Sequence, residues 1–465
     1  MTDAALSGLS LRLAEHVVGT SGTDLRAATV HAASRALLDA VGVMQAASSL
    51  ATEAQPFIHF AQTQGGRPEA SVLGTGVLVP APLAALANGA MAHALDYEDA
   101  YDAAPVHPNA SLIPAVLALA QCEPGISGRD LLTAIAVGCD LVCRLGHSLR
   151  RPLEDGGWYP PPILGAWGAV AGAARLLHLS PRQLLDAWSL MLLQTSTPGE
   201  IKHGNESAIR AVREAFPAQA AVTAVRLAQR GIRGFDAPLE GRDGFYRLFA
   251  GGAYDPAALT VGLGERWAIE QLSFKPWPSC RGTHAAIECA LRLRTAPGVD
   301  LSRIGVVVEG GEVQGMLAEP ALRKREPASA IEAKFSLPFT VATALLDGVV
   351  TLDSFSADAL RRPDVRALAR RIRFERRPEW GREQAVAGAV RIELVGRQSL
   401  REEVLIPRGA PQRPLDDATL LGKFVDCVGR AQRPLASEAA AALADRILGV
   451  DSHSALSAFE WTAPA

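Results

Sequence analysis

The sequence predicts a mostly α protein, in which a large all-helical domain is interrupted by a smaller α+β domain. The 465-residue chain is 48% apolar but only 5% aromatic, and its apolar residues are largely alanine and leucine, the strongest helix formers. Apolar residues recur at helical spacing over most of the first 272 residues. Apart from 71–73, β-branched or alternating segments appear only later. We therefore expect a helical domain at 1–272, completed by 411–465, and an α+β domain at 273–410.

Helices of the first domain are indicated by apolar periodicity and by proline, glycine and serine signals at their ends. A serine that caps a helix and a proline at its first position mark one start, at Ser180-Pro181. The expected order is a helix in 24–52, an extended piece at 71–73, a helix start at 80–82, two or three helices over 83–151 broken at 105–108 and 124–128, a helix after Pro162, one from Ser180-Pro181, and one over 205–230 ending at Gly231.

The second domain mixes helices with short strands. Residues 304–309 are mostly β-branched, and 390–395 alternate apolar and charged residues, which is typical of a strand with one solvent-exposed face. The segment 401–407 is the expected hairpin partner of 390–395. Helices are expected at 284–294 and 335–346, and the chain returns to helix over 415–459.

Charge and composition exclude several classes of protein. The formal net charge is 46 − 49 = −3 with no basic block, which argues against a nucleic-acid partner. The first residues lack a basic region and an uninterrupted apolar run, so we expect no signal peptide. The longest apolar stretch, 163–177, is too short to span a bilayer. Six cysteines without metal-ligand spacing indicate a reduced protein, which we expect to be cytoplasmic and free of membranes.

The first cluster of chemically active residues lies between residues 88 and 108. His93 and Asp96 have i, i+3 spacing and would share a helix face, with Asp99 one turn on. His107 follows on a loop, ahead of a helix that we expect to begin near Pro114. Carboxylates beside imidazoles suit proton transfer. The alternative is a helix end with solvated acids. A metal site is a competing idea, but no paired-histidine zinc motif is present, and we predict none.

Two further clusters are less specific. Tyr159 precedes three prolines, a stiff approach to a helix N-terminus where an anion can bind, although a plain rigid turn has the same pattern. Lys202 and His203 are followed by Arg210 and Arg213, which would lie on one helix face. Such a run is most often a solvated face, and it indicates a functional site only if the other clusters lie close to it.

A fourth cluster occupies a loop at the predicted domain junction. Prolines pin the segment 275–284, which supplies Lys275, Ser279, Cys280, Arg281 and His284 directly before a helix. Arg281 can bind a carboxylate with two parallel hydrogen bonds, and His284 can act as a general acid or base. Cys280 is a weaker candidate for a nucleophile. Small-molecule sites favour such junctions, so we interpret this loop as functional.

These blocks, in this order and spacing, resemble the MmgE/PrpD family, which includes 2-methylcitrate dehydratase, cis-aconitate decarboxylase and iminodisuccinate epimerase. The resemblance implies an all-helical domain with an α+β lid, a homodimer, and an active site between the two domains without metal or organic cofactor. It also implies proton abstraction next to a carboxylate of a small polycarboxylic acid. The strings that carry it are NGAMAHALDYEDA (88–100), HPNASLIPAVLALA (107–120), GWYPPPILGAWGAVAGAARLL (157–177), APLEGRDGF (237–245), KPWPSCRGTH (275–284), AKFSLPFTVATALLDG (333–348) and PLDDATLLGKF (414–424).

The resemblance also implies roles for particular residues. Asp96 matches the family's first active-site aspartate, His107 the histidine of its His-Pro pair, and His284 the histidine that closes the KPxPxCxxTH loop. Lys275 and Arg281 match the basic positions of that loop.

The chain departs from the family pattern at three positions. Tyr159 replaces a histidine of the decarboxylase- and epimerase-like members. Arg210 stands at the position of an active-site lysine, and Phe339 stands where some members have tyrosine. Arginine is always protonated, so Arg210 can bind an anion but is a poor base. Tyr159 can act as an acid or orient a carboxylate.

The sequence therefore predicts a cofactor-independent lyase of the dehydratase type that acts on a small di- or tricarboxylic acid. An epimerase or isomerase, a decarboxylase, or a non-catalytic metabolite-binding homologue are the alternatives. His107 and His284 would transfer protons, Asp96 would orient one histidine, and Tyr159 is a possible acid. The expected substrate-binding residues are Lys202, Arg210, Lys275, Ser279, Arg281 and Phe339.

Overall fold

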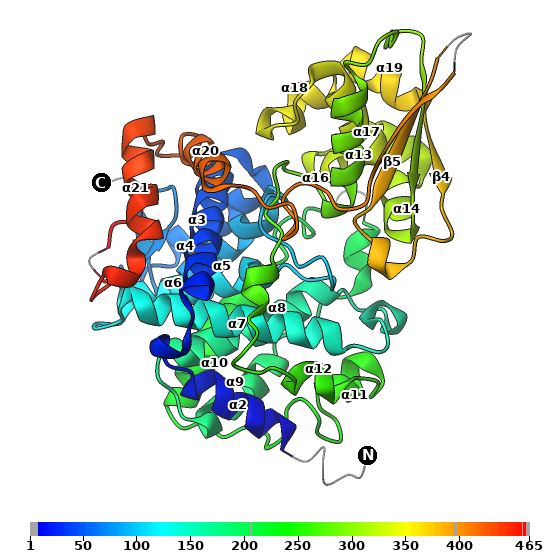
Figure 1. Cartoon of the computed structure of the whole chain (residues 1–465). Helices are drawn as coiled ribbons and strands as arrows, with labels where there is room; N and C mark the ends of the chain where they lie inside the picture. The colour runs from blue at the N-terminus through cyan, green and yellow to red at the C-terminus, as the bar shows by residue number, and fades with distance from the viewer. Residues whose placement is uncertain (1–7, 205–206, 395–397, 458, 462–465) are drawn as a thin grey trace. The chain divides into compact units, whose positions relative to one another are not determined.

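The computed structural model describes residues 8–204, 207–394, 398–457 and 459–461, and most of them are helical (Figure 1). The prediction of a mostly α protein is confirmed. The chain divides into two compact units, which we call the helical unit and the mixed unit. The helical unit comprises Met1–Ala94, Glu98–Leu272 and Asp416–Ala465, and the mixed unit comprises Leu95–Tyr97 and Ser273–Leu415. That the mixed unit acts as a lid stays a prediction.

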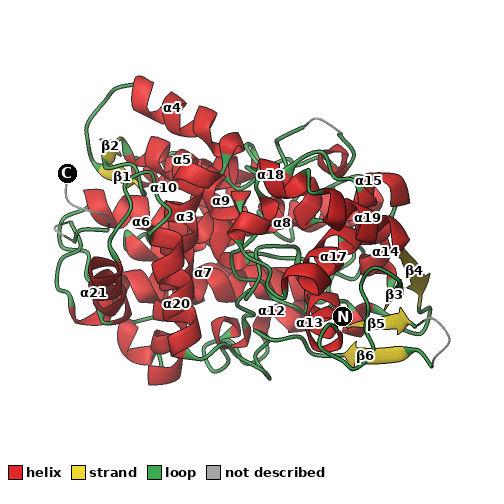
Figure 2. Cartoon of the chain, turned by 90° about the horizontal axis from the view of Figure 1, so that it is seen from above, coloured by secondary structure: helices red, strands yellow, loops and turns green. Residues whose placement is uncertain are grey.

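The helical unit contains one small antiparallel sheet, β1 with β2, among its helices (Figure 2). Its elements are α2 (Leu9–Gly19), α3 (Ala27–Leu50), α4 (Gln55–Thr63), β1 (Ala70–Val72), β2 (Val77–Val79), α5 (Ala81–Ala94), α6 (Pro108–Cys122), α7 (Gly128–Ser148), α8 (Pro160–Leu176), α9 (Pro181–Leu192), α10 (Ala215–Gln229), α11 (Phe245–Ala250), α12 (Pro256–Thr260), α20 (Asp417–Val428) and α21 (Ser437–Leu448).

Local signals explain where several of these helices begin. Ser127 and Ser180 each accept a hydrogen bond from the backbone three residues on and so cap α7 and α9, as expected at Ser180. The three prolines before Ile163 belong to α8 itself, which begins at Pro160 and not after Pro162 as predicted. Proline fits there because the first helical turn has no partner for its missing N–H.

The prediction of a helix from residue 205 is wrong in its first half. Residues 205 and 206 lie outside the described part, and 209–214 form turns before α10 begins at Ala215. Pro217 explains the late start, because a proline ring in a helix collides with the carbonyl of the residue four positions earlier, here Arg213. Arg210 and Arg213 therefore do not share a helix face. Similarly, the expected helix over 415–459 is two helices, α20 and α21, separated at Gly429 and Pro434.

The core of the helical unit depends on close contact between α7 and α8, which pack along each other (Figure 1). α7 is long and apolar enough to cross a membrane, but 94% of its most apolar window is buried, as in the core helix of a soluble protein. Gly138 on α7 faces Gly168 on α8. A Cβ at Gly168 would lie 2.5 Å from the Gly138 carbonyl oxygen and would overlap the Val142 side chain.

Replacing Gly168 with alanine is expected to lower the free energy of unfolding by about 1–3 kcal/mol, because the two helices must move apart. Gly422→Ala is the matched control. Gly422 lies in the exposed face of α20 with no atom within 4 Å of an added Cβ. Alanine there should stabilise the helix slightly. Urea denaturation of both variants measures the difference, and equal stabilities would contradict the packing described here.

The mixed unit is built on a four-stranded sheet in the order β4-β3-β5-β6, with β3 and β4 parallel and the other pairs antiparallel. Its elements are α13 (His284–Leu293), β3 (Gly305–Gly310), α14 (Glu312–Ala318), α15 (Ala321–Arg325), α16 (Ala330–Lys334), α17 (Leu337–Asp347), α18 (Ala357–Leu360), α19 (Pro363–Arg371), β4 (Ile372–Arg376), β5 (Gly388–Glu393) and β6 (Leu400–Val404).

The two faces of this sheet differ as the alternating pattern predicts. Val308 and Val390 are paired and buried on the face against α13, where a Cβ at Gly388 would lie 3.1 Å from the Ala285 Cβ. The other face carries cross-strand ion pairs such as Arg401 with Glu309. The predicted strand 390–395 and its hairpin partner are confirmed, although residue 395 lies outside the described residues. Strand β4 was not predicted, because three of its five residues are charged.

Candidate active site

Helix α5 ends one residue before the acidic cluster, so the predicted shared helix face of His93 and Asp96 is wrong. α5 stops at Ala94, and Asp96 has a positive φ of 49°. This left-handed conformation is uncommon for a residue with a side chain but is tolerated by aspartate. Lys334 Nζ donates to the Leu95 carbonyl at 2.8 Å and Lys275 Nζ donates to the Asp96 carbonyl at 3.0 Å. In a longer helix these two carbonyl groups would accept hydrogen bonds from backbone N–H groups of the next turn. Here the two lysine ammonium groups take that place.

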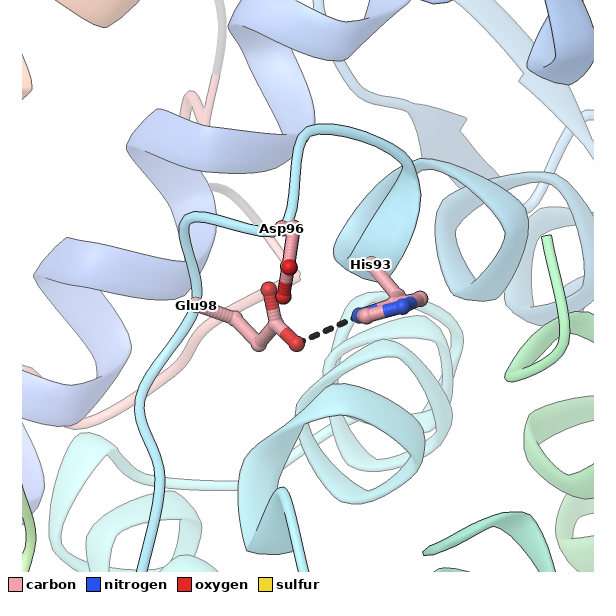
Figure 3. A group of neighbouring side chains, drawn as sticks. All are labelled: His93, Asp96 and Glu98. Atoms are coloured by element: carbon pink, nitrogen blue, oxygen red, sulfur yellow. Dashed lines mark hydrogen bonds and ion pairs between the residues drawn. The ribbon is translucent and has the colours of Figure 1, made fainter. Parts of the chain in front are cut away.

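The acids that follow α5 are buried, which excludes a helix end with solvated acids. Asp96, Glu98 and Asp99 are each at most 2% exposed. Glu98 Oε1 lies 2.5 Å from His93 Nδ1 (Figure 3) and 2.9 Å from His107 Nδ1. One carboxylate therefore contacts two imidazoles, whose ring centroids are 5.5 Å apart.

His107 is held by one ring nitrogen and presents the other. Its Nδ1 faces Glu98 Oε1 and the Asp99 carbonyl oxygen, which is 3.1 Å away. Within the part of the chain that the structure describes, Nε2 has no hydrogen-bond partner. The ring is 17% exposed. A histidine oriented through Nδ1 by a carboxylate, with Nε2 available, is the usual arrangement of a general base.

The position of His107 is fixed by α6. His107 is the residue that precedes this helix, which begins at Pro108 and not near Pro114 as predicted. Proline at the first helical position explains the start. Asn109 Nδ2 in the first turn donates to Asp99 Oδ2 at 2.9 Å. The acidic segment is thereby tied to the helix that carries the candidate base.

A second group of contacts surrounds Tyr159, at the N-terminus of α8. Arg213 Nη1 donates to the Tyr159 hydroxyl oxygen at 2.8 Å, and Arg213 Nε donates to Glu214 Oε1 at 2.9 Å. Glu214 Oε2 accepts a hydrogen bond from Ser111 Oγ on α6 at 2.5 Å. Lys202 Nζ lies 5.8 Å from the centroid of the Tyr159 ring. The predicted residues Tyr159 and Lys202 are thus brought together, with Arg213 as the hydrogen-bond partner of Tyr159.

These contacts tie three helix N-termini to one another. His107, Tyr159 and Glu214 are the N-cap residues of α6, α8 and α10. Ser111 links α6 to α10, and Arg213 links α10 to α8. Each helix N-terminus carries a partial positive charge and free backbone N–H groups. Their grouping in the helical unit produces an environment that favours an anion.

In the mixed unit, Lys275 forms a buried ion pair with Asp96. Lys275 Nζ lies 2.5 Å from Asp96 Oδ1, and the two side chains are 0% and 1% exposed. Tyr97 donates to the Pro276 carbonyl at 3.3 Å, which further fixes the segment 95–97 against the loop that begins at Lys275. The predicted role of Asp96 in orienting a histidine stays a prediction.

The loop 275–284 is organised around His284, the first residue of α13. His284 Nε2 lies 3.1 Å from the Ser279 carbonyl oxygen, and Nδ1 lies 3.4 Å from Arg281 Nη1. Arg281 Nη1 also donates to the Arg408 carbonyl at 3.0 Å. Ser279 Oγ is 2.8 Å from Thr283 Oγ1. Both nitrogens of His284 therefore contact the chain itself, and its role in proton transfer stays a prediction, as do the binding roles of Ser279 and Arg281.

Arg210 and Phe339 are the remaining predicted residues. Arg210 is half-buried in the turns before α10, and Phe339 is buried in α17 with its ring centroid 6.0 Å from that of Phe355. Their binding roles stay predictions. Glu98 and Arg213 belong to the acidic and basic clusters seen in the sequence, but neither was selected from it as a site residue. Pro217 was the available signal for Arg213, because it places the helix start after that residue.

His93, Asp96 and Glu98 also form the one described group whose ligand atoms could surround a cation. Their ligand atoms lie within 4.8 Å of one another, all inside one stretch of six residues (Figure 3). Lys275 already supplies a positive charge at Asp96, and two histidines contact Glu98. The chain thus provides partners for both carboxylates, and the expectation of no metal stays a prediction.

Comparison with known proteins places the chain in a family. The model of the MmgE/PrpD N-terminal domain matches residues 11–257, and that of the MmgE/PrpD C-terminal domain matches residues 277–446. The chain belongs to the MmgE/PrpD family. The resemblance seen in the sequence motifs is thereby confirmed.

Several relatives carry the name cis-aconitate decarboxylase. The Mus musculus protein is 27% identical over 65% of this chain and 62% of its own length, so the chain spans less than two thirds of that relative. The Aspergillus terreus protein is 27% identical over 77% of this chain and 76% of its own length. The cis-aconitate decarboxylase-like protein oryM of Aspergillus oryzae is 25% identical over 90% of each chain.

Proposed function

We propose that the protein is a lyase that acts on a small di- or tricarboxylic acid and removes a proton from the carbon next to a carboxylate. The observation that carries this proposal is the geometry of His107. Its Nδ1 is hydrogen-bonded to the Asp99 carbonyl oxygen and lies 2.9 Å from Glu98 Oε1, while Nε2 stays available. The grouped helix N-termini and the cations Lys202 and Arg213 supply the electrostatic environment that an acidic substrate requires. Family membership supports the same conclusion.

In the dehydration that we favour, His107 Nε2 takes the proton from the carbon next to the carboxylate. The electron pair of that C–H bond forms the new double bond, and the neighbouring C–O bond breaks. Tyr159 is the predicted acid that gives its proton to the departing hydroxide, so that water leaves. His107 then returns its proton to Tyr159 through solvent. Neutralising charge at the reacting carboxylate is what makes the C–H bond acidic enough for this step.

Decarboxylation is the second candidate, and the names of the relatives favour it. In that reaction the C–C bond to a carboxylate breaks, carbon dioxide leaves, and the carbon receives a proton. Protonated His107 would be the donor. The same residues serve both reactions, because each needs one proton transferred at a carbon beside a carboxylate.

A panel of hydroxylated and unsaturated di- and tricarboxylic acids, read by mass spectrometry, tests the proposal. Loss of water confirms dehydration and loss of carbon dioxide confirms decarboxylation. Turnover without a mass change, with deuterium entering one carbon in heavy water, would show that the protein is an epimerase and not a lyase. Thermal stabilisation by the acids without any turnover would contradict catalysis and indicate a metabolite-binding homologue. The predicted homodimer and cytoplasmic location stay predictions.

A further inference from the structure

Arg213 has a hydrogen-bonding group that the described chain does not use. The residue is 4% exposed, yet its Nη2 group is buried and has no hydrogen-bond partner among the described residues. The other two nitrogens of the guanidinium group are bonded, Nε to Glu214 and Nη1 to Tyr159. A buried charged donor without an acceptor is costly, so such a group generally has a partner that is not part of the chain.

The guanidinium group is mounted rigidly. Glu214, which holds Nε, is itself fully buried and bonded to Ser111 on α6. Gly165 on α8 allows this close packing, because a Cβ there would lie 3.0 Å from Ser111 Oγ and 3.5 Å from Glu214 Oε2. A ligand that bonds Nη2 therefore meets an arginine whose conformation is already fixed, which removes most of the entropy cost of ordering it.

A charged donor group favours an anion as this missing partner. Burial alone would lower the pKa of Arg213, but interactions with Tyr159, Glu214 and Glu98 outweigh it and raise the pKa above the usual value. Arg213 is therefore always charged. The ammonium group of Lys202 lies near the Tyr159 ring, and the N-termini of three helices are tied together here.

We infer that Arg213, and not Arg210, is the residue of the helical unit that binds a carboxylate of the substrate, through Nη2. Tyr159 accepts the hydrogen bond from Arg213, so its own proton points away from Arg213 and can be donated beside the bound carboxylate. Arg213 is thereby a specificity-determining residue that requires a second acidic group on the substrate. The inference rests on the proposed function for the class of ligand.

Binding of tricarballylate tests this inference without turnover, because this tricarboxylate has neither a hydroxyl group nor a double bond to react. We expect Arg213→Gln to raise its Kd by about 10- to 100-fold, the effect of losing one charge-assisted hydrogen bond. Arg213→Lys should lose less. Arg230→Gln, an exposed arginine at the other end of α10, is the matched control. Isothermal titration calorimetry gives the values.

The inference is overturned if Arg213→Gln binds tricarballylate as the wild type does, if only Arg210→Gln weakens binding, or if the wild type does not bind tricarballylate. Should Arg213→Gln not fold, the affinities of the wild type and of Arg213→Lys for tricarballylate and for its monoamides provide the same answer. Each monoamide has a neutral amide in place of one carboxylate. The wild type should discriminate strongly against one monoamide and the variant weakly. Binding that depends on Arg213 without turnover of any acid would refute the proposed lyase activity but would still support Arg213 as the carboxylate-binding residue.

Discussion

Replacing His107 with glutamine is expected to lower kcat by about 10²- to 10⁴-fold, the usual contribution of a general base. Glutamine keeps a polar side chain of similar size, and it can still bond Glu98, but it cannot accept a proton from carbon. Binding of tricarballylate should change little, because His107 is not the group that holds the carboxylate. Steady-state kinetics on the substrate found in the panel, with calorimetry in parallel, separate the two effects.

Two comparisons make this result specific. His147→Gln removes an exposed histidine of α7 and should keep wild-type kcat. Glu98→Gln should lower kcat by less than His107→Gln, because the base remains but the carboxylate beside its Nδ1 is lost. Imidazole added to His107→Ala should restore part of the activity. Turnover in His107→Gln equal to that of the wild type would refute the assignment of the base.

Replacing Lys275 with methionine is expected to lower the free energy of unfolding by about 3–5 kcal/mol, because the change leaves the buried Asp96 carboxylate without its cation. The double variant Lys275→Met with Asp96→Asn should recover much of this loss. Asparagine also tolerates the positive φ at residue 96, so the turn itself is preserved. Chemical denaturation of the single and double variants gives the coupling between the two side chains.

An exposed ion pair of the same unit provides the control. Arg370 and Glu326 are 59% and 41% exposed, and Arg370→Met should cost less than about 1 kcal/mol. A similar loss for Lys275→Met and Arg370→Met would show that the buried pair is not required for stability. Asp96 would then be retained for chemistry alone.

Most helices could be predicted from the sequence because their signals are local. Ser180 and Pro181 mark the start of α9, and the alternation of apolar and charged residues marks β5 with its hairpin partner. The errors were also local in origin. Pro217 delays α10, and the left-handed Asp96 ends the helical path after α5. In both places a periodic pattern continued past the point where the backbone leaves the helix.

The pairings of the candidate site could not be predicted in the same way. Arg213 and Tyr159 are 54 positions apart, and Lys275 and Asp96 are 179 apart. Residue type indicated that acids, histidines and cations were present, but only the packing of α6, α8 and α10 selects Arg213 as the partner of Tyr159. The packing of α5 against α6 likewise explains why Glu98 contacts both histidines.

Proton NMR in heavy water tests the central claim most directly. The carbon next to a carboxylate takes up deuterium when the unsaturated product of a dehydration is hydrated in reverse, and when the carbon left by a decarboxylation is protonated. The wild type should exchange or incorporate deuterium at the carbon next to a carboxylate. His107→Gln should lose this exchange while it still binds tricarballylate. Deuterium incorporation at an undiminished rate in His107→Gln would contradict proton transfer by His107. Hydration of the unsaturated acid or decarboxylation by the wild type without any deuterium at that carbon would contradict it as well.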